Sequence, residues 1–472
     1  MPQEVIPITQ SIIEQLGKFF KPRSVAVVGV SKHPEKIGHI IFKSLLESQY
    51  RGMIYPVNPK GGDIIGHMAY PSILDCPDDT ELAVITIAAK YTPQVIEQCG
   101  KKGVRNVVIV SGGFKEVGNE ELESQIVEIA RQNSIRIIGP NCIGVYDAKT
   151  KVETFFQSHE RMIRPSYGPI SFLTQSGTYG ASFLELLDED GLGVSKFVSY
   201  GNKADVNEAD MLQYLAEDQD TRVMAIYLEA IGRGEGRTFF EVAKEVTRKK
   251  PVVIYKTGTT TEGTTAAKSH TGHLSSQAAV YNGVFKQTGI LSVRNFDELL
   301  AVSKALAFQP LPKGNRCAFV SNGIGPVIAM IDAAVNNKLE IANLQESTKE
   351  NLRENFPPYF VVENPVDVTG SATSKDYSVA LEAFLDDSNV DVLVPWFVFQ
   401  DTPLDENIIN VLDKMNKRQE KPILVGAHGG PYTKKMTKLI QEKGIPVFDQ
   451  AGKVIAAASA LCRYKRYLTR KS

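Results

Sequence analysis

The sequence has little that would tie it to a membrane, a metal or an oxidising compartment. Its five cysteines are scattered over 472 residues, with no CxxC pair and no spacing typical of zinc sites. No apolar run reaches the roughly 18 residues of a membrane span, and the first residues show no signal-peptide pattern. We therefore expect a cytoplasmic protein with reduced thiols, no membrane partner and no metal site of its own.

An excess of either charge is also missing. The chain has 54 acidic and 53 basic residues. Proteins that hold nucleic acid or acidic membranes through bulk charge need a positive surplus. We therefore expect no nucleic-acid partner. The length predicts roughly three domains.

Short apolar runs alternate with amphipathic stretches along the first 150 residues. The runs 24–30, 52–57, 82–88 and 106–110 are typical of strands, and 37–48 has helical spacing. This alternation predicts βαβ units, and hence a parallel sheet covered by helices on both faces. In such sheets ligands bind at the carboxyl ends of the strands.

The turn after the first predicted strand, which begins Gly29-Val30-Ser31, lacks most of a dinucleotide-binding fingerprint. Glycine would be needed at positions 31 and 34, where the chain has Ser31 and Pro34. The acidic residue that holds a free ribose about 20 residues later is also missing. Lys60 follows the second strand instead, and a lysine suits a phosphorylated ribose better. An NAD(P)-dependent oxidoreductase is therefore a disfavoured alternative.

Two further α/β patterns follow, at about 151–311 and 312–472, separated by the Pro/Gly-rich segment 308–314. Each places a small polar turn, 174–180 or 321–326, between a short strand and a helix. The free N–H groups and the dipole at such a helix start favour an anion. The first turn is no serine-hydrolase elbow, because positions 174 and 178 are threonine.

A Gly/Thr-rich loop, 256–274, lies between the apolar run 252–255 and a helical pattern from near Ser275. It contains His270 and His273. Composition alone leaves two interpretations: a surface loop that happens to hold two histidines, or a functional loop, since long loops in compact α/β units are usually functional.

Several motifs resemble those of the NDP-forming acyl-CoA synthetases, the superfamily of succinyl-CoA synthetase and ADP-forming acetyl-CoA synthetase. The closest are Ser269-His270-Thr271-Gly272, Gly139-Pro140-Asn141-Cys142 and the run 201–206. This resemblance covers nearly the whole chain. It implies an α/β protein with a Rossmann-like CoA-binding domain, 1–150, followed by two flavodoxin-like domains of the succinyl-CoA synthetase type: the phosphohistidine domain, 151–311, and a ligase-CoA domain, 312–472.

The resemblance also implies catalytic roles. His270 accepts a phosphoryl group, and His273 falls outside the matching position. Glu229, after the predicted strand 223–228, hydrogen-bonds the active ring, which fixes its tautomer and stabilises its positive charge. A charge-assisted hydrogen bond is worth about 1.5–3 kcal/mol, against roughly 0.3–1 kcal/mol for a helix terminus. We therefore expect the carboxylate to matter more than either helix dipole.

Binding residues are implied in the same way. The implied CoA contacts follow the first strands: Gly29, Ser31, Lys60, Ala88, Ala89, Lys90, Ser111, Gly112 and Gly113. The implied phosphate contacts lie at the two helix starts: Gln175, Ser176, Gly177, Thr178, Asn322, Gly323 and Gly325. Many relatives have glycine where this chain has Ile324, which bears on the geometry of the second turn.

The implied activity is that of the α subunit of an ADP-forming acid–CoA ligase. It would interconvert acyl-CoA, ADP and phosphate with acid, CoA and ATP, through acyl phosphate and phosphohistidine. No ATP-grasp unit is visible after residue 311, so ATP or ADP with Mg would be held by an ATP-grasp β subunit, in an α2β2 heterotetramer, or by a missing C-terminal half. A non-catalytic CoA-binding regulatory protein is the other alternative, disfavoured because a sensor needs neither His270 nor Glu229. The acyl group stays open.

Overall fold

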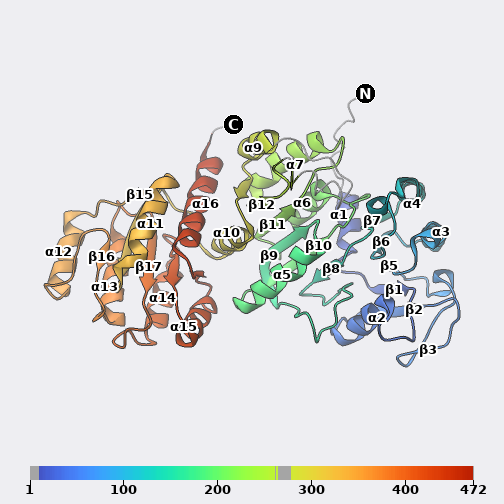
Figure 1. The fold of residues 1–472 in the computed structure, drawn as a ribbon, viewed down its shortest axis with the longest axis horizontal. Coiled ribbons are helices and arrows are strands. Elements are labelled where there is room, and N and C mark those ends of the chain that lie inside the picture. Colours follow the sequence, from blue (N-terminus) through green and yellow to red (C-terminus); the bar gives the residue numbers. More distant parts are fainter. Residues whose placement is uncertain (1–9, 261, 264–277, 471–472) are drawn as a thin grey trace. The chain divides into compact units, whose positions relative to one another are not determined.

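The computed structural model describes residues 10–260, 262–263 and 278–470 (Figure 1). The chain divides into two compact units. Unit 1 comprises residues 1–189 and 193–292, and unit 2 comprises 190–192 and 293–472. Parallel sheets with helices between their strands build both units, which confirms the predicted α/β class.

The first sheet of unit 1 has five parallel strands in the order β2-β1-β5-β6-β7. Its strands are β1 (Ser24–Val28), β2 (Met53–Val57), β5 (Leu82–Ile85), β6 (Asn106–Ile109) and β7 (Arg136–Ile138). The connecting and flanking elements are α1 (Gln10–Gly17), α2 (Ile37–Glu47), the hairpin of β3 (Asp63–Ile64) and β4 (His67–Met68), the 3-10 turns η1 (Ile73–Asp75), η2 (Ala89–Tyr91) and η3 (Lys115–Val117), α3 (Thr92–Lys102) and α4 (Glu120–Gln132). Alternate residues of β1 pack on α1 and α2 or on α3 and α4, so the sheet is covered on both faces, as predicted.

The second sheet of unit 1 has the order β13-β12-β11-β9-β10-β8; β9, β10, β11 and β12 are parallel, and β8 runs antiparallel to β10. Its strands are β8 (Gly144–Asp147), β9 (Tyr167–Thr174), β10 (Val194–Ser199), β11 (Val223–Leu228), β12 (Val252–Lys256) and β13 (Leu291–Val293). Its described helices are α5 (Gly177–Glu189), α6 (Glu208–Glu217), α7 (Gly236–Lys249) and α9 (Ala278–Thr288). One hydrophobic core contains residues of both sheets, which explains why they form one unit.

Unit 2 holds a third sheet in the order β15-β14-β17-β18-β19, with β16 also paired to β14. Its strands are β14 (Arg316–Ser321), β15 (Glu340–Ile341), β16 (Val366–Asp367), β17 (Val392–Phe397), β18 (Val425–Ala427) and β19 (Val447–Phe448). Its helices are α10 (Phe296–Phe308), α11 (Ile324–Asn336), α12 (Glu346–Asn355), α13 (Ser374–Asp386), α14 (Ile408–Lys417), α15 (Pro431–Gln441) and α16 (Ala451–Thr469). Cys317 and Phe319 of β14 pack towards α11 and α16, whereas Ala318 and Val320 join the core of α12 to α15.

The predicted domain limits near 150 and 311 stay predictions. Strand β8 ends before residue 150 and yet pairs with β10 of the second sheet. Helix α10 ends before residue 311 and packs on α16 within unit 2. Strand β8 therefore belongs to the second sheet and helix α10 to unit 2, although each precedes the predicted limit in the sequence.

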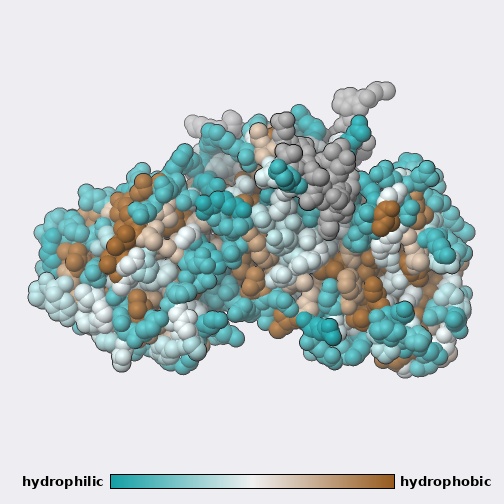
Figure 2. Space-filling view, viewed as in Figure 1, coloured by the Kyte–Doolittle hydropathy of each residue, from teal (hydrophilic) through white to brown (hydrophobic). Residues whose placement is uncertain are grey.

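The surface in Figure 2 is largely hydrophilic, but apolar surface gathers over α11. Ile328 and Val335, seven residues apart on that helix, are 57% and 61% exposed. Contiguous exposed apolar patches, when large, mark sites of interaction.

Across the described stretches, every helix is too short or too polar to cross a lipid bilayer.

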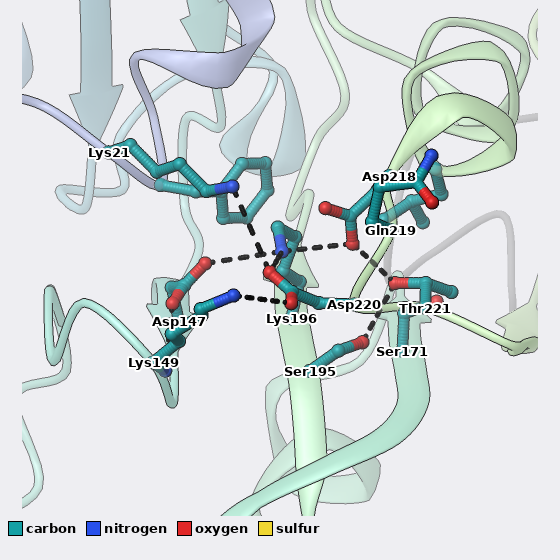
Figure 3. Close-up of polar contacts among 12 residues, drawn as sticks. Lys21, Asp147, Lys149, Ser171, Ser195, Lys196, Asp218, Gln219, Asp220 and Thr221 are labelled. Carbon is teal, nitrogen blue, oxygen red and sulfur yellow. Dashed lines mark hydrogen bonds and ion pairs between the residues drawn. The ribbon is translucent and has the colours of Figure 1, made fainter.

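A fully buried lysine lies where β8, β10 and the segment after α6 meet (Figure 3). Lys196 Nζ lies 2.9 Å from Asp218 Oδ2, 3.3 Å from Asp147 Oδ2 and 3.5 Å from Asp220 Oδ2. Its side chain is 0% exposed. Burial opposes its charged form, but Asp147 and Asp218 outweigh that effect and raise the pKa of Lys196.

Two further cations reach the same cluster from its outer side. Lys149 Nζ lies 2.8 Å from Asp220 Oδ1, and Lys21 Nζ lies 3.8 Å from Asp220 Oδ2 (Figure 3). Burial opposes ionisation of Asp220, but its hydrogen bonds with Lys149 and Tyr167 and the charge of Lys196 lower its pKa to about 2.

We expect Lys196→Met to lower the free energy of unfolding of unit 1 by about 3–5 kcal/mol at pH 7, because it leaves buried carboxylates without their central cation. Because the pKa of Lys196 is raised, its full contribution to the free energy of unfolding is present below its usual pKa of 10.5 and is lost at higher pH. The lowered pKa of Asp220 makes its contribution complete above 3.8 and lost towards pH 2. Urea unfolding across this range measures both effects. Lys149→Met is the control: Lys149 is exposed, so solvent screens its pair with the same aspartate and its loss should cost much less. An equal loss in both variants would contradict the role of burial.

Candidate functional site

Three buried polar residues of unit 1 lie at the carboxyl ends of neighbouring strands. Gln175 follows β9, Glu229 follows β11, and Lys256 ends β12. Strands β9, β11 and β12 are adjacent and parallel, so these residues share one edge of the sheet. All three are less than 10% exposed. The structure therefore brings the predicted Glu229 and Gln175 together and adds Lys256 to them.

Gln175 connects the ends of β9 and β11 through its side-chain amide. Its Oε1 accepts hydrogen bonds from the N–H groups of Glu229, at 2.5 Å, and Ala230, at 2.9 Å. Its Nε2 donates to Ala230 O at 2.9 Å. The backbone that carries Glu229 is thus held in place by a side chain 54 residues earlier in the chain.

Lys256 places a second polar group against Glu229. Its Nζ donates to Glu229 O at 2.7 Å and to Thr257 O, and it lies 4.5 Å from the centre of the Tyr281 ring. Burial lowers the pKa of Lys256 to about 8, although the charge of Glu229 acts in the opposite direction. Burial therefore makes the neutral amine more accessible than in an ordinary lysine. This residue was not predicted from the sequence, because a lysine that ends a strand shows its burial only in the folded chain.

The helix start after β9 has a local hydrogen-bond pattern of its own. Thr174 Oγ1 donates to Ser176 O at 2.7 Å and accepts from Ser176 N at 3.0 Å. Helix α5 then begins at Gly177, inside the segment 174–180 that was predicted as a turn. The N–H groups of Gly177 and Thr178, in the first turn, have no acceptor within the helix, so they are suited to an anion.

Unit 2 repeats this arrangement after β14. Ser321 Oγ donates to Gly323 O at 2.8 Å and accepts from Gly323 N at 2.9 Å. Asn322 Oδ1 accepts from Val398 N at 2.9 Å, and Nδ2 donates to Val398 O at 2.9 Å, which connects β14 to the end of β17. Helix α11 begins at Ile324, with Gly325 in its first turn. Each unit therefore has the same triplet: a hydroxyl that ends the strand, a bridging amide and a small residue before the helix.

This geometry refines the predicted phosphate contacts. The side-chain amides of Gln175 and Asn322 hold neighbouring strand ends together, and Asn322 Nδ2 also donates to Asp401 Oδ2 at 2.8 Å. The backbone N–H groups at Gly177, Thr178 and Gly325 are the better-suited anion donors. That the residues of the two turns contact phosphate stays a prediction.

The predicted CoA contacts all lie at the carboxyl edge of the first sheet. They follow four of its five strands in turn: Gly29 and Ser31 after β1, Lys60 after β2, Ala88, Ala89 and Lys90 after β5, and Ser111, Gly112 and Gly113 after β6. The strand order reverses at β1, which makes this edge the usual ligand site of such a sheet.

The turn after β1 depends on Gly29. Its φ is +100°, and a Cβ there would lie 2.7 Å from Ile87 and Thr86 side-chain atoms. Gly38, in α2, approaches so closely that its Cβ would lie 2.3 Å from Gly29 O. The helix start is therefore pressed against the turn, as a phosphate-binding turn requires.

Exposed cations surround this edge. Lys60 and Lys90 follow β2 and β5, as predicted, and both are exposed. Lys32, missed by the sequence analysis, lies beside the loop after β2, where a Cβ on Gly62 would be 3.2 Å from Lys32 Nζ. The sequence signal that could have identified Lys32 is its position directly after Ser31, in the turn that follows β1. An anionic ligand with several phosphates fits this set of lysines.

His270 and His273 lie outside the described residues. The predicted contact of the His270 ring with Glu229 therefore stays a prediction. What the structure does describe is the base of their loop, which starts directly after Lys256 at the same sheet edge as Glu229.

Three family models match successive parts of the chain. A CoA binding domain matches residues 23–148, a succinyl-CoA ligase like flavodoxin domain matches 167–306, and a ligase-CoA domain matches 318–470. Their order is that of the three sheets.

Proteins of known name match almost the whole chain. The subunit alpha of acetate–CoA ligase [ADP-forming] II from Pyrococcus furiosus is 40% identical, over 94% of this chain and 97% of its own. The acetate–CoA ligase [ADP-forming] of Methanocaldococcus jannaschii is 36% identical over 94% of this chain but only 62% of its own length. The structure of an acetyl-coenzyme A synthetase 1 of Ca. Korarchaeum cryptofilum in complex with phosphate and ADP is 34% identical, covers 96% of this chain and 97% of that chain, and superposes with a TM-score of 0.90.

We expect Gln175→Leu to destabilise unit 1 by about 1–3 kcal/mol for each buried backbone group that loses its partner. Urea unfolding measures the loss, and hydrogen exchange of the Glu229 and Ala230 amides should accelerate. Gln213→Leu is the matched control, because within the described part of the chain the side chain of Gln213 makes a single hydrogen bond, of 3.3 Å, to Ala209 O on its own helix. Unchanged exchange at Glu229 in the Gln175 variant would contradict the bridging role.

Proposed function

This chain belongs to the α-subunit family of ADP-forming acetyl-CoA synthetases, and from that premise we propose how its residues carry the ligase reaction. The reaction interconverts acyl-CoA, ADP and phosphate with acid, CoA and ATP. The observation that carries the proposal is the placement of Glu229, fixed by Gln175 and Lys256 at the base of the loop that contains His270. Acyl phosphate and a phosphohistidine are the proposed intermediates.

In this proposal His270 is the nucleophile that takes the phosphoryl group from acyl phosphate. One ring nitrogen attacks the phosphorus, and the bond to the acyl oxygen breaks, which releases the acid. Glu229 holds the other ring nitrogen, keeps the reactive tautomer and stabilises the positive ring afterwards. Such phosphoryl transfers depend mainly on positioning and on charge stabilisation. The hydrogen-bonded backbone around Glu229 supports a role in positioning, and the two helix starts support a role in charge stabilisation.

The phosphoryl oxygens would be held by helix N-termini. The first turn of α5 offers the N–H groups of Gly177 and Thr178 beside Ser176, in unit 1. The first turn of α11 offers the N–H group of Gly325 in unit 2, after the N-cap Gly323, whose own N–H donates to Ser321 Oγ. Both turns have the same three kinds of residue in sequence: a hydroxyl that ends the strand, a bridging amide and a small residue before the helix. This likeness supports the same role for both turns.

CoA would bind at the carboxyl edge of the first sheet. The close turn at Gly29 leaves room for backbone approach to a phosphate, and Lys60 would meet the ribose phosphate. The matched CoA binding domain supports this placement. When bound, CoA supplies the thiol that accepts or releases the acyl group.

A partner subunit is implied by the subunit naming of close relatives. We propose that the partner is an ATP-grasp β subunit that holds ATP or ADP with Mg, in an α2β2 assembly. The Methanocaldococcus relative supports a second functional part, since this chain spans only 62% of it. The exposed apolar face of α11 supports a contact surface for a partner.

We expect the chain alone to bind CoA more tightly than NADH, and dephospho-CoA less tightly than CoA, because Lys60 then loses its phosphate. Calorimetry measures all three affinities. In Lys60→Gln the preference for CoA over dephospho-CoA should disappear, whereas Lys101→Gln, an exposed lysine at the end of α3, should retain it. Equal affinity for CoA and dephospho-CoA in the unaltered chain would remove the Lys60 assignment.

We expect His270→Asn to abolish both acid-labile phosphate incorporation and turnover of the reconstituted complex, with CoA affinity unchanged. His273→Asn should still be phosphorylated. Glu229→Gln should form phosphohistidine slowly, because the ring loses charge stabilisation but keeps a hydrogen-bond partner. Mass spectrometry at neutral or basic pH locates the phosphate, and a panel of acyl-CoA substrates with the complex defines the acid.

Two results would contradict this proposal. One is phosphate on His273, or undiminished phosphate in the His270→Asn protein. The other is ADP-dependent release of CoA from acyl-CoA by the purified chain without its partner.

A further inference from the structure

A cavity of about 700 Å³ lies at the opposite edge of the first sheet from the CoA contacts. Its lining comes from the segments directly before β1 and β2 and from the turn after β8. Parallel strands have their amino ends at one edge and their carboxyl ends at the other, so this cavity and the predicted CoA contacts are separate.

The described lining contains five cationic side chains and no carboxylate. The cations are Lys21, Arg23, Arg51, Lys149 and Lys151. The chain as a whole has a net charge of −1, so this local surplus is a property of the fold and not of the composition. A water-filled hollow with cations on several sides focuses positive potential.

Neighbouring carboxylates compensate only part of this charge. Arg23 pairs with Glu81 at 2.7 Å, a carboxylate that Lys18 shares at 2.9 Å. Lys149 and Lys21 pair with Asp220, which Lys196 already shares from the buried side (Figure 3). Each of the two carboxylates therefore serves more than one cation.

The two remaining cations of the cavity, Arg51 and Lys151, are not matched in this way. Among the described residues, neither forms an ion pair. Their positive charge is therefore available to a ligand, and an arginine next to lysines suits phosphate oxygens through its planar fork.

The walls of the cavity are fixed by hydrogen bonds. Tyr50 Oη donates to Pro22 O at 2.8 Å, and Thr150 Oγ1 donates to Phe20 O at 2.6 Å. Asp147 Oδ1 accepts from the N–H groups of Lys149 and Thr150 at 2.9 and 2.8 Å, which closes the turn that carries Lys149 and Lys151. The cations therefore come from anchored backbone.

Gly52 allows two segments of the cavity wall to lie directly against each other. A Cβ there would lie 2.6 Å from Arg23 O and 2.0 Å from Tyr50 Oη. The segments before β1 and β2 approach each other this closely only because position 52 has no side chain.

We propose that this cavity binds a small anion with at least two linked phosphate groups, at a second site distinct from that of CoA. Five cations with two shared carboxylates suit a multivalent anion better than a single orthophosphate. The volume lies within the range of small-molecule sites. The cavity joins segments of the first sheet to the turn after β8 of the second sheet, so its ligand stabilises unit 1 by mass action.

Calorimetry of the full chain with inorganic triphosphate, at physiological salt, tests this proposal. The unaltered chain should bind triphosphate more tightly than orthophosphate, and saturating CoA should not displace it. Arg51→Gln/Lys151→Gln should weaken binding by about tenfold or more for each cation removed, with unchanged CoA affinity and thermal stability. Arg131→Gln/Lys101→Gln removes the same charges from α4 and α3, outside the cavity, and should bind triphosphate within about twofold of the unaltered chain, since such rim charges are screened.

ATP is a second probe in the same variants. ATP that binds more tightly than triphosphate, and is weakened by the Arg51/Lys151 change, identifies a nucleotide as the ligand. ATP that binds less tightly, with the same sensitivity to that change, identifies an inorganic polyphosphate. The proposal is overturned by absence of triphosphate binding, by equal affinity for orthophosphate, by equal losses in the two double variants, or by displacement with CoA.

Discussion

The backbone N–H groups just beyond the carboxyl end of a buried parallel strand must find acceptors, and both units depend on how this is achieved. Gln175 supplies the acceptor for the end of β11, and Asn322 supplies it for the end of β17. A hydroxyl from the last strand residue holds the next turn in each case. Because side chains meet these local needs, the first N–H groups of α5 and α11 are left for a ligand. The helix starts and the proposed anion site are thus consequences of one constraint, the need of buried N–H groups for acceptors.

The fold class and the longer strands were predictable because these strands are short apolar runs bounded by turn residues, as at 223–228 and 252–256. Two-residue strands such as β3 and β15 contain a polar residue and show no such run. The existence of the two Gly-rich helix starts was predictable, but their exact first residue was not. Helix α5 begins at Gly177, within the predicted turn, because the first turn of a helix need not be apolar. The use of Gln175 was not predictable, since its partners lie 54 and 55 residues away. The lowered pKa of Lys256 depends on burial, which only the folded sheet creates.

The two edges of the first sheet differ in how they present positive charge. At the carboxyl edge, Lys32, Lys60 and Lys90 are exposed around a turn that is closed tightly by Gly29 and Gly38. At the amino edge, the cations line a hollow whose walls are hydrogen-bonded. An overall charge near zero conceals both, because it averages over residues that the fold separates. A net charge near zero therefore argues only against binding of large polyanions. Binding of small phosphorylated ligands depends on where the individual cations lie in the fold.

The cluster around Lys196 has a consequence for how unit 1 responds to heat. The free-energy penalty for removing ions from water falls as temperature rises, because ion hydration has a strongly negative entropy, while hydrophobic stabilisation per unit area levels off. A lysine that is 0% exposed among three aspartates therefore contributes a growing share of the folding free energy on heating. The junction of β8, β10 and the segment after α6 becomes relatively stronger at temperatures where apolar packing gains nothing further.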